Sequence, residues 1–278
     1  MIILAHDGSV YSDWVAHYAL QMAAKEDDRK LLILNVLDGK VNADLVEAKL
    51  AQLADDCRAR DIEPGYELLP LGTSVHRTLR QAIPHTPAAL LVCGTRIKPN
   101  RRDFLTGTIA EKLLRMHLCP VLALRVVQPG LLGNPHDLLL PLAGHATGFE
   151  RAWPVFRRLA PALRQVHLFR ALPVHPLLMS HLTPAREQAL RKIGTAHLEE
   201  IYQEMLVQLG EQAIMTDRRV MVTSDWPNEV LVQASRLKVQ MILLGVSERS
   251  LAHRVFHGIG IERVLRATPC DVGIYRGP

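Results

Sequence analysis

The chain repeats itself. Residues 94–115 read GTRIKPNRRDFLTGTIAEKLLR, and residues 245–266 read GVSERSLAHRVFHGIGIERVLR. A shift of 151 residues places Gly94 on Gly245 and Gly107 on Gly258, and the match continues without a gap toward the end of each half. Self-similarity at a fixed period indicates that one structural unit occurs twice, and this limits the folds that the chain can adopt.

The two halves differ in length. Near their starts the shift is shorter, because ILAHDGSV at 3–10 pairs with LLPLAGHA at 139–146. The second half therefore carries an insertion, which we place near 173–200. Glycine and proline in QPGLLGNPH, at 128–136, are typical of a linker. The sequence predicts a first domain at 1–128 and a second at 137–278.

Each half alternates short apolar runs with helical patterns. The first half offers strands in MIILAH, KLLILNVLD, YELLPLG, AALLVCG and PVLALRVV, and the second at 138–142, 165–170, 219–223, 239–244 and 272–275. Apolar strands that alternate with helices predict a parallel sheet covered on both faces, which is a doubly wound α/β fold. Such sheets bind ligands beyond the carboxyl ends of their strands, where Gly94 and Gly245 lie.

Composition excludes several classes of protein. Hydrophobic residues make up 48% of the chain and charged residues 22%, as in globular proteins. We see neither a signal peptide nor an apolar run long enough to span a membrane. The net charge is +5, but only 5% of residues are aromatic and none interleave with basic runs, so a nucleic-acid partner is not expected. The four cysteines form no C-x-x-C pair, which favours buried thiols in a reducing cytoplasm.

Several short motifs occur together in the first half. Its first strand leads into Asp7-Gly8-Ser9. A loop then reads Gly94, two residues, Ile97, nine residues and Gly107-Thr108, followed by AEKLLR at 110–115 and CPV at 119–121. In these motifs the chain resembles the universal stress protein family, in its tandem form, although that family has a second glycine where Ile97 stands.

The resemblance implies a fold and a ligand. Each half would be a five-stranded parallel sheet of order 3-2-1-4-5. The halves would form an intramolecular pseudo-dimer by pairing 121–126 with 272–276, and two tandem chains could assemble into a homodimer. Binding members of the family hold ATP, with adenine and ribose near the first-strand aspartate and the end of the second strand. The triphosphate, which Mg²⁺ could accompany, lies on the glycine loop.

The residues themselves allow this site and leave alternatives open. Asp7 could accept from ribose or adenine, or it could cap a turn. Val36 could line the adenine pocket or belong to the core. Gly94 and Gly107 let a backbone approach phosphate closely, and the Thr108 hydroxyl could bind phosphate or cap a helix.

The loop between the glycines carries opposing signals. The β-branched Ile97 resists positive φ and adds bulk where the family has none. Four cations in the same loop could hold a triphosphate by charge, or could simply form an exposed basic loop. These are Arg96, Lys98, Arg101 and Arg102.

The second half has lost the matching ligand groups. Ala143 replaces the aspartate, Glu248 stands at the second-glycine position, and Ile259 replaces the hydroxyl residue. We therefore expect no nucleotide there. His253 and His257 lack a third metal ligand, so no metal site is predicted, and the absence of G-x-S-x-G and G-x-x-x-x-G-K-[ST] motifs leaves no catalytic residue.

Three functions remain. The first is a non-catalytic cytoplasmic stress protein that binds ATP or another adenine nucleotide in its first domain. The second is a stress protein that binds no nucleotide and acts through protein contacts. The third is a weak nucleotide hydrolase with slow ATP hydrolysis.

Overall fold

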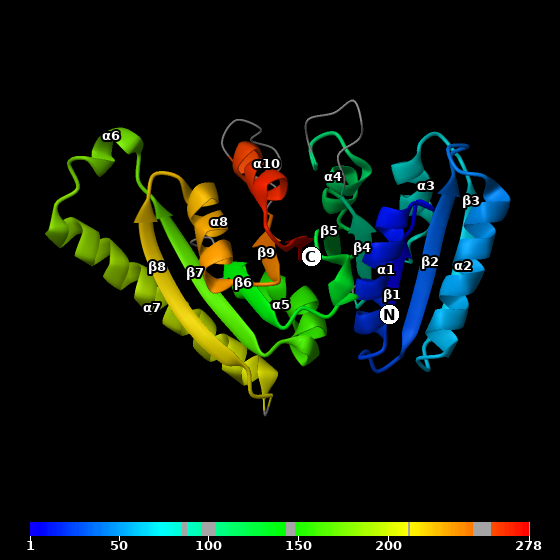
Figure 1. The fold of residues 1–278 in the computed structure, drawn as a ribbon, viewed down its shortest axis with the longest axis horizontal. Coiled ribbons are helices and arrows are strands. Elements are labelled where there is room, and N and C mark those ends of the chain that lie inside the picture. The colour runs from blue at the N-terminus through cyan, green and yellow to red at the C-terminus, as the bar shows by residue number, and fades with distance from the viewer. Residues whose placement is uncertain (85–87, 96–103, 143–147, 211, 247–256, 278) are drawn as a thin grey trace. The chain divides into compact units, whose positions relative to one another are not determined.

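The computed structural model describes residues 1–84, 88–95, 104–142, 148–210, 212–246 and 257–277. The chain divides into two compact units (Figure 1). Unit 1 comprises Met1–Asn134 together with Tyr275–Pro278, and unit 2 comprises Pro135–Ile274.

Unit 1 is a parallel sheet with a helix in each connection. Its strands lie in the order β3-β2-β1-β4-β5, and every pair is parallel. The elements are β1 (Ile2–Ala5), α1 (Val10–Ala23), β2 (Lys30–Leu37), α2 (Ala43–Arg58), β3 (Glu63–Pro70), α3 (Val75–Ala82), β4 (Leu90–Gly94), α4 (Ile109–Leu114) and β5 (Val121–Arg125). A single turn of 3₁₀ helix, η1 (Pro129–Leu131), follows.

Unit 2 repeats this arrangement, with its strands in the order β8-β7-β6-β9-β10. Between β7 and β8 it has α6 and a 26-residue α7, where unit 1 has the 16-residue α2. Its elements are β6 (Asp137–Pro141), α5 (Gly148–Leu159), η2 (Ala160–Ala162), β7 (Gln165–Pro173), α6 (Pro176–Met179), α7 (Pro184–Leu209), β8 (Met215–Thr223), α8 (Trp226–Leu237), β9 (Met241–Gly245), α10 (His257–Ala267) and β10 (Asp271–Arg276).

The predicted doubly wound α/β fold is confirmed, and its winding creates a switch point. In unit 1 the chain runs outward from β1 through β2 to β3, then returns to β4 on the other side of β1 (Figure 1). Because such crossovers are right-handed, reversing direction moves the later helices to the opposite face of the sheet. Ala5 pairs with Cys93, so β1 and β4 end side by side.

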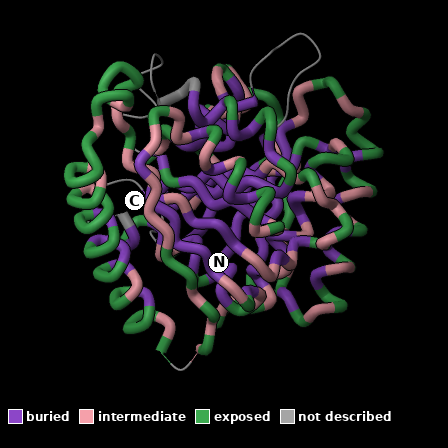
Figure 2. Tube along the Cα trace, turned by 60° about the vertical axis from the view of Figure 1, so that its left-hand side comes forward, coloured by how far each residue is buried: buried purple, intermediate pink, exposed green. Residues whose placement is uncertain are grey.

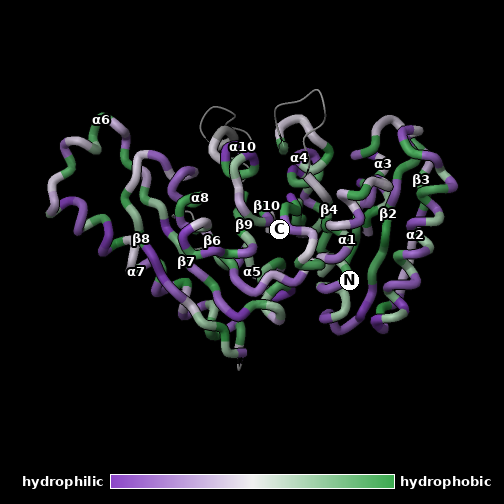
Figure 3. Tube along the Cα trace, viewed as in Figure 1, coloured by the Kyte–Doolittle hydropathy of each residue, from purple (hydrophilic) through white to green (hydrophobic). Residues whose placement is uncertain are grey.

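The strands supply the core of both units. Ile2, Ile3 and Leu4 in β1 and Leu138, Leu139 in β6 have no exposed surface. Figure 2 shows buried residues concentrated in the interior of the trace and exposed residues along its outer turns, and Figure 3 shows hydrophobic residues along β2. Among the residues described, no helix is both long and apolar enough to cross a membrane.

Candidate functional site

The turn after β1 is tightly hydrogen-bonded. Asp7 Oδ1 accepts from Ser9 N at 3.0 Å, from the Ser9 hydroxyl, and from Ser12 Oγ at 2.6 Å. Ser9 in turn caps α1, because its hydroxyl accepts from Ser12 N. Gly8 has a φ of 77°, a backbone conformation that residues with a side chain rarely adopt. Asp7 thus acts as a turn residue while its carboxylate remains exposed at the carboxyl edge of the sheet.

A buried histidine lies directly before this turn. His6 is 4% exposed, its Nδ1 accepts from Gly8 N at 3.1 Å, and its Nε2 lies 3.1 Å from Asp13 Oδ1. The other oxygen of Asp13 accepts from Lys49 Nζ at 2.6 Å. Partial burial acts to raise the pKa of Asp13, but hydrogen bonds and charge from His6 and Lys49 outweigh it and hold that pKa below its ordinary value. These contacts join β1, α1 and α2.

Asn35 fixes the same corner from β2. Its Nδ2 donates to the His6 carbonyl at 2.8 Å, and the residue is only 2% exposed. Neither Asn35 nor His6 stands in a sequence motif that predicts this role. The available signal was a polar side chain in an otherwise apolar run, within KLLILNVLD for Asn35 and at the end of MIILAH for His6.

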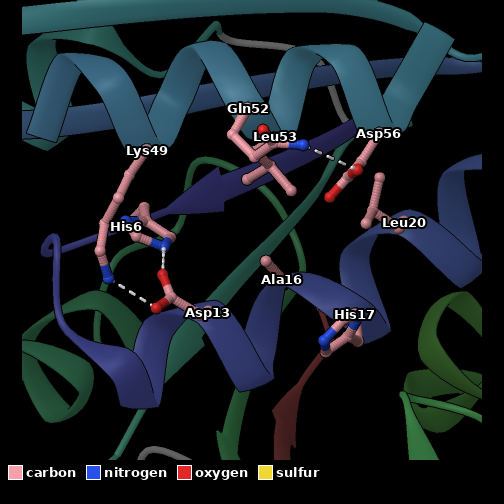
Figure 4. A pocket seen from close by; sticks show the side chains of 9 residues that line it. All are labelled: His6, Asp13, Ala16, His17, Leu20, Lys49, Gln52, Leu53 and Asp56. Atoms are coloured by element: carbon pink, nitrogen blue, oxygen red, sulfur yellow. Dashed lines mark hydrogen bonds and ion pairs between the residues drawn. The ribbon is translucent and has the colours of Figure 1, made fainter. Parts of the chain in front are cut away.

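A pocket of about 230 Å³ extends from His6 between α1 and α2 (Figure 4). At one end of the pocket, the Asp13 carboxylate accepts hydrogen bonds from His6 and Lys49. At the other end, Gln52 Nε2 lies 3.4 Å from Asp56 Oδ1. Most of its polar groups therefore bind one another, and its volume falls below the roughly 300 Å³ at which ligand pockets usually begin. The lining residues are His6, Asp13, Ala16, His17, Leu20, Lys49, Gln52, Leu53 and Asp56.

His17 is the unpaired polar group of this pocket. Its Nδ1 is buried and has no hydrogen-bond partner among the described residues. Burial lowers the pKa of His17, as does the charge of Arg60, whereas Asp56 and Asp13 act in the opposite direction. His17 is therefore held toward its neutral form. Within the described ranges, no three His, Cys, Asp or Glu side chains gather as a metal site would require.

The second part of the predicted site lies at the end of β4. Gly94 is exposed there, beside the end of β1. Thr108 caps α4, because its hydroxyl accepts from Glu111 N at 3.2 Å and donates to the Leu105 carbonyl at 2.6 Å. Gly107, with a φ of 71°, donates its N–H to Glu111 Oε2 at 2.5 Å. A phosphate at this loop would compete with the Glu111 carboxylate for that N–H.

Glu111 is not an isolated charge. It is 8% exposed, and its Oε1 accepts from Arg115 Nη2 at 2.8 Å. Val36, predicted to line an adenine pocket, is 9% exposed at the end of β2. Of the loop cations, Arg96, Lys98, Arg101 and Arg102 all lie outside the described residues, as does Ile97.

Two positions that flank the corresponding turn are apolar in unit 2. The shorter repeat shift pairs His6 with Leu142 and Asp13 with Phe149, which are 6% and 1% exposed. Ala143, at the aspartate position, and Glu248 lie outside the described residues. Where unit 1 has a buried histidine bound to a carboxylate, unit 2 has two apolar side chains.

Comparison with known proteins relates the first half of the chain to one family. Residues 1–125 match the model of the universal stress protein family. A protein of Staphylococcus saprophyticus named as a universal stress protein is 26% identical over 139 residues, covering 45% of this chain and 82% of that protein. A counterpart from Staphylococcus haemolyticus is 28% identical over 139 residues, covering 45% and 83%.

A solved structure extends the likeness of fold to both halves. A universal stress protein from Archaeoglobus fulgidus superposes with a TM-score of 0.62 at 15% identity, covering 99% of this chain and 96% of that chain. At that identity the likeness concerns the fold alone. The family model thus identifies residues 1–125 as a universal stress protein domain.

Proposed function

We propose that this chain is a tandem universal stress protein whose unit 1 binds ATP or another adenine nucleotide, and whose unit 2 does not. The observation that carries this proposal is the exposed Asp7, whose carboxylate is held in a tight turn after β1, at the edge where β1 and β4 end side by side. This is the switch point of unit 1, where ligands of doubly wound sheets bind.

The site is assigned in parts. Asp7 would accept from ribose hydroxyls or the adenine amino group, and Val36 would lie against the base. Gly94 and Gly107 would admit the phosphates, with Thr108 positioning the loop as the cap of α4. Arg96 and Lys98 would supply positive charge, and Mg²⁺ would accompany the triphosphate. No group with an activated nucleophile or base is assigned, so the proposed role is binding rather than hydrolysis.

The test begins with freshly purified protein. It is denatured and filtered, and the supernatant is analysed for nucleotide by ion-exchange chromatography. ATP is then titrated into stripped protein with and without Mg²⁺. Asp7→Asn keeps an acceptor for Ser9 and Ser12 but removes the charge, so we expect ATP affinity to fall about tenfold, as for loss of one charged hydrogen bond.

Asp61→Asn is the matched control. Asp61 is an exposed aspartate of unit 1 with a φ of 55°, which asparagine tolerates. It should bind ATP as the wild type does. Equal affinity in the wild type and the Asp7→Asn variant would remove Asp7 from the site, and no binding in either would refute the proposal.

A second candidate function rests on unit 2. Apolar side chains stand exposed on α6 and α7, which lie between β7 and β8: Leu177 is 75% exposed, Ile193 63% and Val207 81%. Large apolar side chains that are exposed on a surface can take part in contacts with a protein partner. This favours the alternative of a protein partner, which a pull-down comparing the wild type with Leu177→Ser and Val207→Ser would detect.

Compartment and assembly complete the proposal. All four cysteines are buried and free, as expected in the reducing cytoplasm. The family resemblance also predicts that the two units pair with each other and that two chains form a homodimer, and both remain predictions. Light scattering coupled to size-exclusion chromatography would decide between one and two chains.

A further inference from the structure

His6 uses both of its ring nitrogens. The carboxylate of Asp13 can only accept, so Nε2 must carry the proton in the 3.1 Å contact with Asp13 Oδ1. The neutral ring then has a lone pair on Nδ1, which is the atom that Gly8 N–H approaches at 3.1 Å. The partner of one nitrogen thus fixes the role of the other.

Asp13 is itself held in place. Its Oδ2 accepts from Lys49 Nζ at 2.6 Å, so the carboxylate stays charged and aligned with His6 (Figure 4). His6 is additionally fixed through its carbonyl, which accepts from Asn35 Nδ2. His6 is 4% exposed, and its ring cannot turn away without breaking the contacts with Asp13 and Gly8.

The consequence falls on the turn that begins at Asp7. Gly8 must hold a φ of 77°, and a Cβ added to it would lie 3.0 Å from Val46 Cγ2 of α2. A hydrogen bond to its N–H stabilises this conformation, and with it the position of the Asp7 carboxylate. We propose that His6 is a positioning residue that sets the Asp7-Gly8-Ser9 turn through Nδ1, and that Asp13 selects the tautomer that makes this possible.

The internal repeat supports this assignment. Unit 2 has Leu142 at the His6 position and Phe149 at the Asp13 position, and there the aspartate of the turn is Ala143. The histidine, its carboxylate partner and the turn aspartate are thus present together in one unit and absent together in the other. If His6 served packing alone, Leu142 shows that a buried apolar residue could occupy the position.

Two substitutions test the roles of the two ring nitrogens of His6 separately. His6→Asn places an oxygen near the Nδ1 position and can still accept from Gly8, but it loses Asp13. His6→Gln places its amide nitrogen near the Nε2 position and can still donate to Asp13, but it loses Gly8. If His6 served packing alone, the two variants should affect the turn equally. If His6 positions the turn, His6→Asn should keep the Gly8 hydrogen bond and His6→Gln should lose it.

The first readout needs no ligand. We expect the Gly8 amide, followed by NMR hydrogen exchange without nucleotide, to exchange about fivefold or more faster in His6→Gln than in the wild type, and to stay close to wild type in His6→Asn. Asp13→Asn should behave like His6→Gln, because its amide can donate to Nε2 and so move the proton to Nδ1. Unchanged Gly8 exchange in His6→Gln, or equal changes in both His6 variants, would overturn the proposal.

The second readout rests on the proposed function. If unit 1 binds ATP through this turn, the dissociation constant should rise severalfold in His6→Gln and stay near wild type in His6→Asn. A wild type that binds no ATP would refute nucleotide binding only, since Gly8 exchange still decides the role of His6. A wild type that binds ATP with equal affinity in His6→Gln would overturn the role of His6 at the site.

Discussion

The first helix of unit 1 and the first helix of unit 2 follow the first strand of their sheets, but different chemistry holds each in place. In unit 1, Asp13 of α1 binds His6, which directly follows β1, and Lys49 of α2. In unit 2 the Asp13 position is Phe149, whose ring lies 5.5 Å from that of Phe156 and 6.0 Å from that of Trp153. Unit 1 thus uses hydrogen bonds and an ion pair where unit 2 uses aromatic packing.

The difference teaches what each solution supplies. Aromatic packing contributes large apolar burial with few directional requirements. Buried polar contacts add little net stability, but they fix particular atoms in particular places. Unit 1, which carries the proposed ligand site, uses the arrangement that positions a turn, whereas unit 2 uses the one that stabilises a helix.

The largest effect is expected from the aromatic cluster. Phe156→Ala removes a ring with no exposed surface, so we expect the free energy of unfolding of unit 2 to fall by about 3–5 kcal/mol. Urea unfolding followed by Trp153 fluorescence would measure it. Arg151→Ala, an exposed change on the same helix, is the control, and a loss for Phe156→Ala of the same size as this control would contradict aromatic anchoring of α5.

A second contrast lies between α8 and α10. A Cβ added to Gly260 would lie 2.3 Å from Trp226 Cζ2, and the longer repeat shift places Ile109 and Val75 at these positions in unit 1. Gly260→Ala should therefore destabilise unit 2 by about 1–3 kcal/mol through overpacking. Making the same change in a Trp226→Val background should cost much less, as urea unfolding would show. Equal costs in both backgrounds would mean that the Trp226 ring is not the obstacle.

The contacts among His6, Asp13 and Lys49 predict that the stability of unit 1 depends on pH. The pKa of Asp13 is lowered in the folded state, so its charged form stabilises the fold above the ordinary aspartate range, and this contribution is lost as the pH falls through it. The difference in unfolding free energy between wild type and Asp13→Asn should be present near pH 7 and shrink toward about pH 3. A difference independent of pH would show that the charge of Asp13 contributes nothing.

The smallest effect is expected from Lys49. The side chains of Lys49 and Asp13 are 27% and 39% exposed, so solvent screens their attraction. Lys49→Met should lower the unfolding free energy by less than about 1 kcal/mol while keeping the apolar stem. High salt should remove most of the difference in chemical unfolding. A loss as large as that of Phe156→Ala would mean that unit 1 depends on the ion pair for stability rather than for positioning.

Local sequence patterns predicted the order of strands and helices well. Apolar runs such as KLLILNVLD become strands because their side chains are buried on both faces of a parallel sheet, as the buried Leu31, Ile33 and Leu34 show. The ends were less accurate: β8 begins at Met215, where a strand was expected only from 219. Its first residues are polar or exposed and carry no apolar signal.

The candidate site was predicted only in part. Asp7, Gly94 and Gly107 stand in recognisable motifs, so sequence alone could name them. The contacts among His6, Asp13 and Lys49 could not be predicted, because Asp13 and Lys49 meet only when α1 and α2 pack together. Thr108-x-x-Glu111 has the spacing of a capping box, which predicts that Glu111 reaches back to the start of α4, but the N–H that it binds is that of Gly107.

The stoichiometry of ATP binding to the stripped full-length chain tests the central contrast most directly. Isothermal titration calorimetry with Mg²⁺ should give one site per chain, with affinity weakened by Asp7→Asn in unit 1. Two sites per chain would contradict the assignment of unit 2 as the non-binding half. No site at millimolar ATP would contradict nucleotide binding altogether.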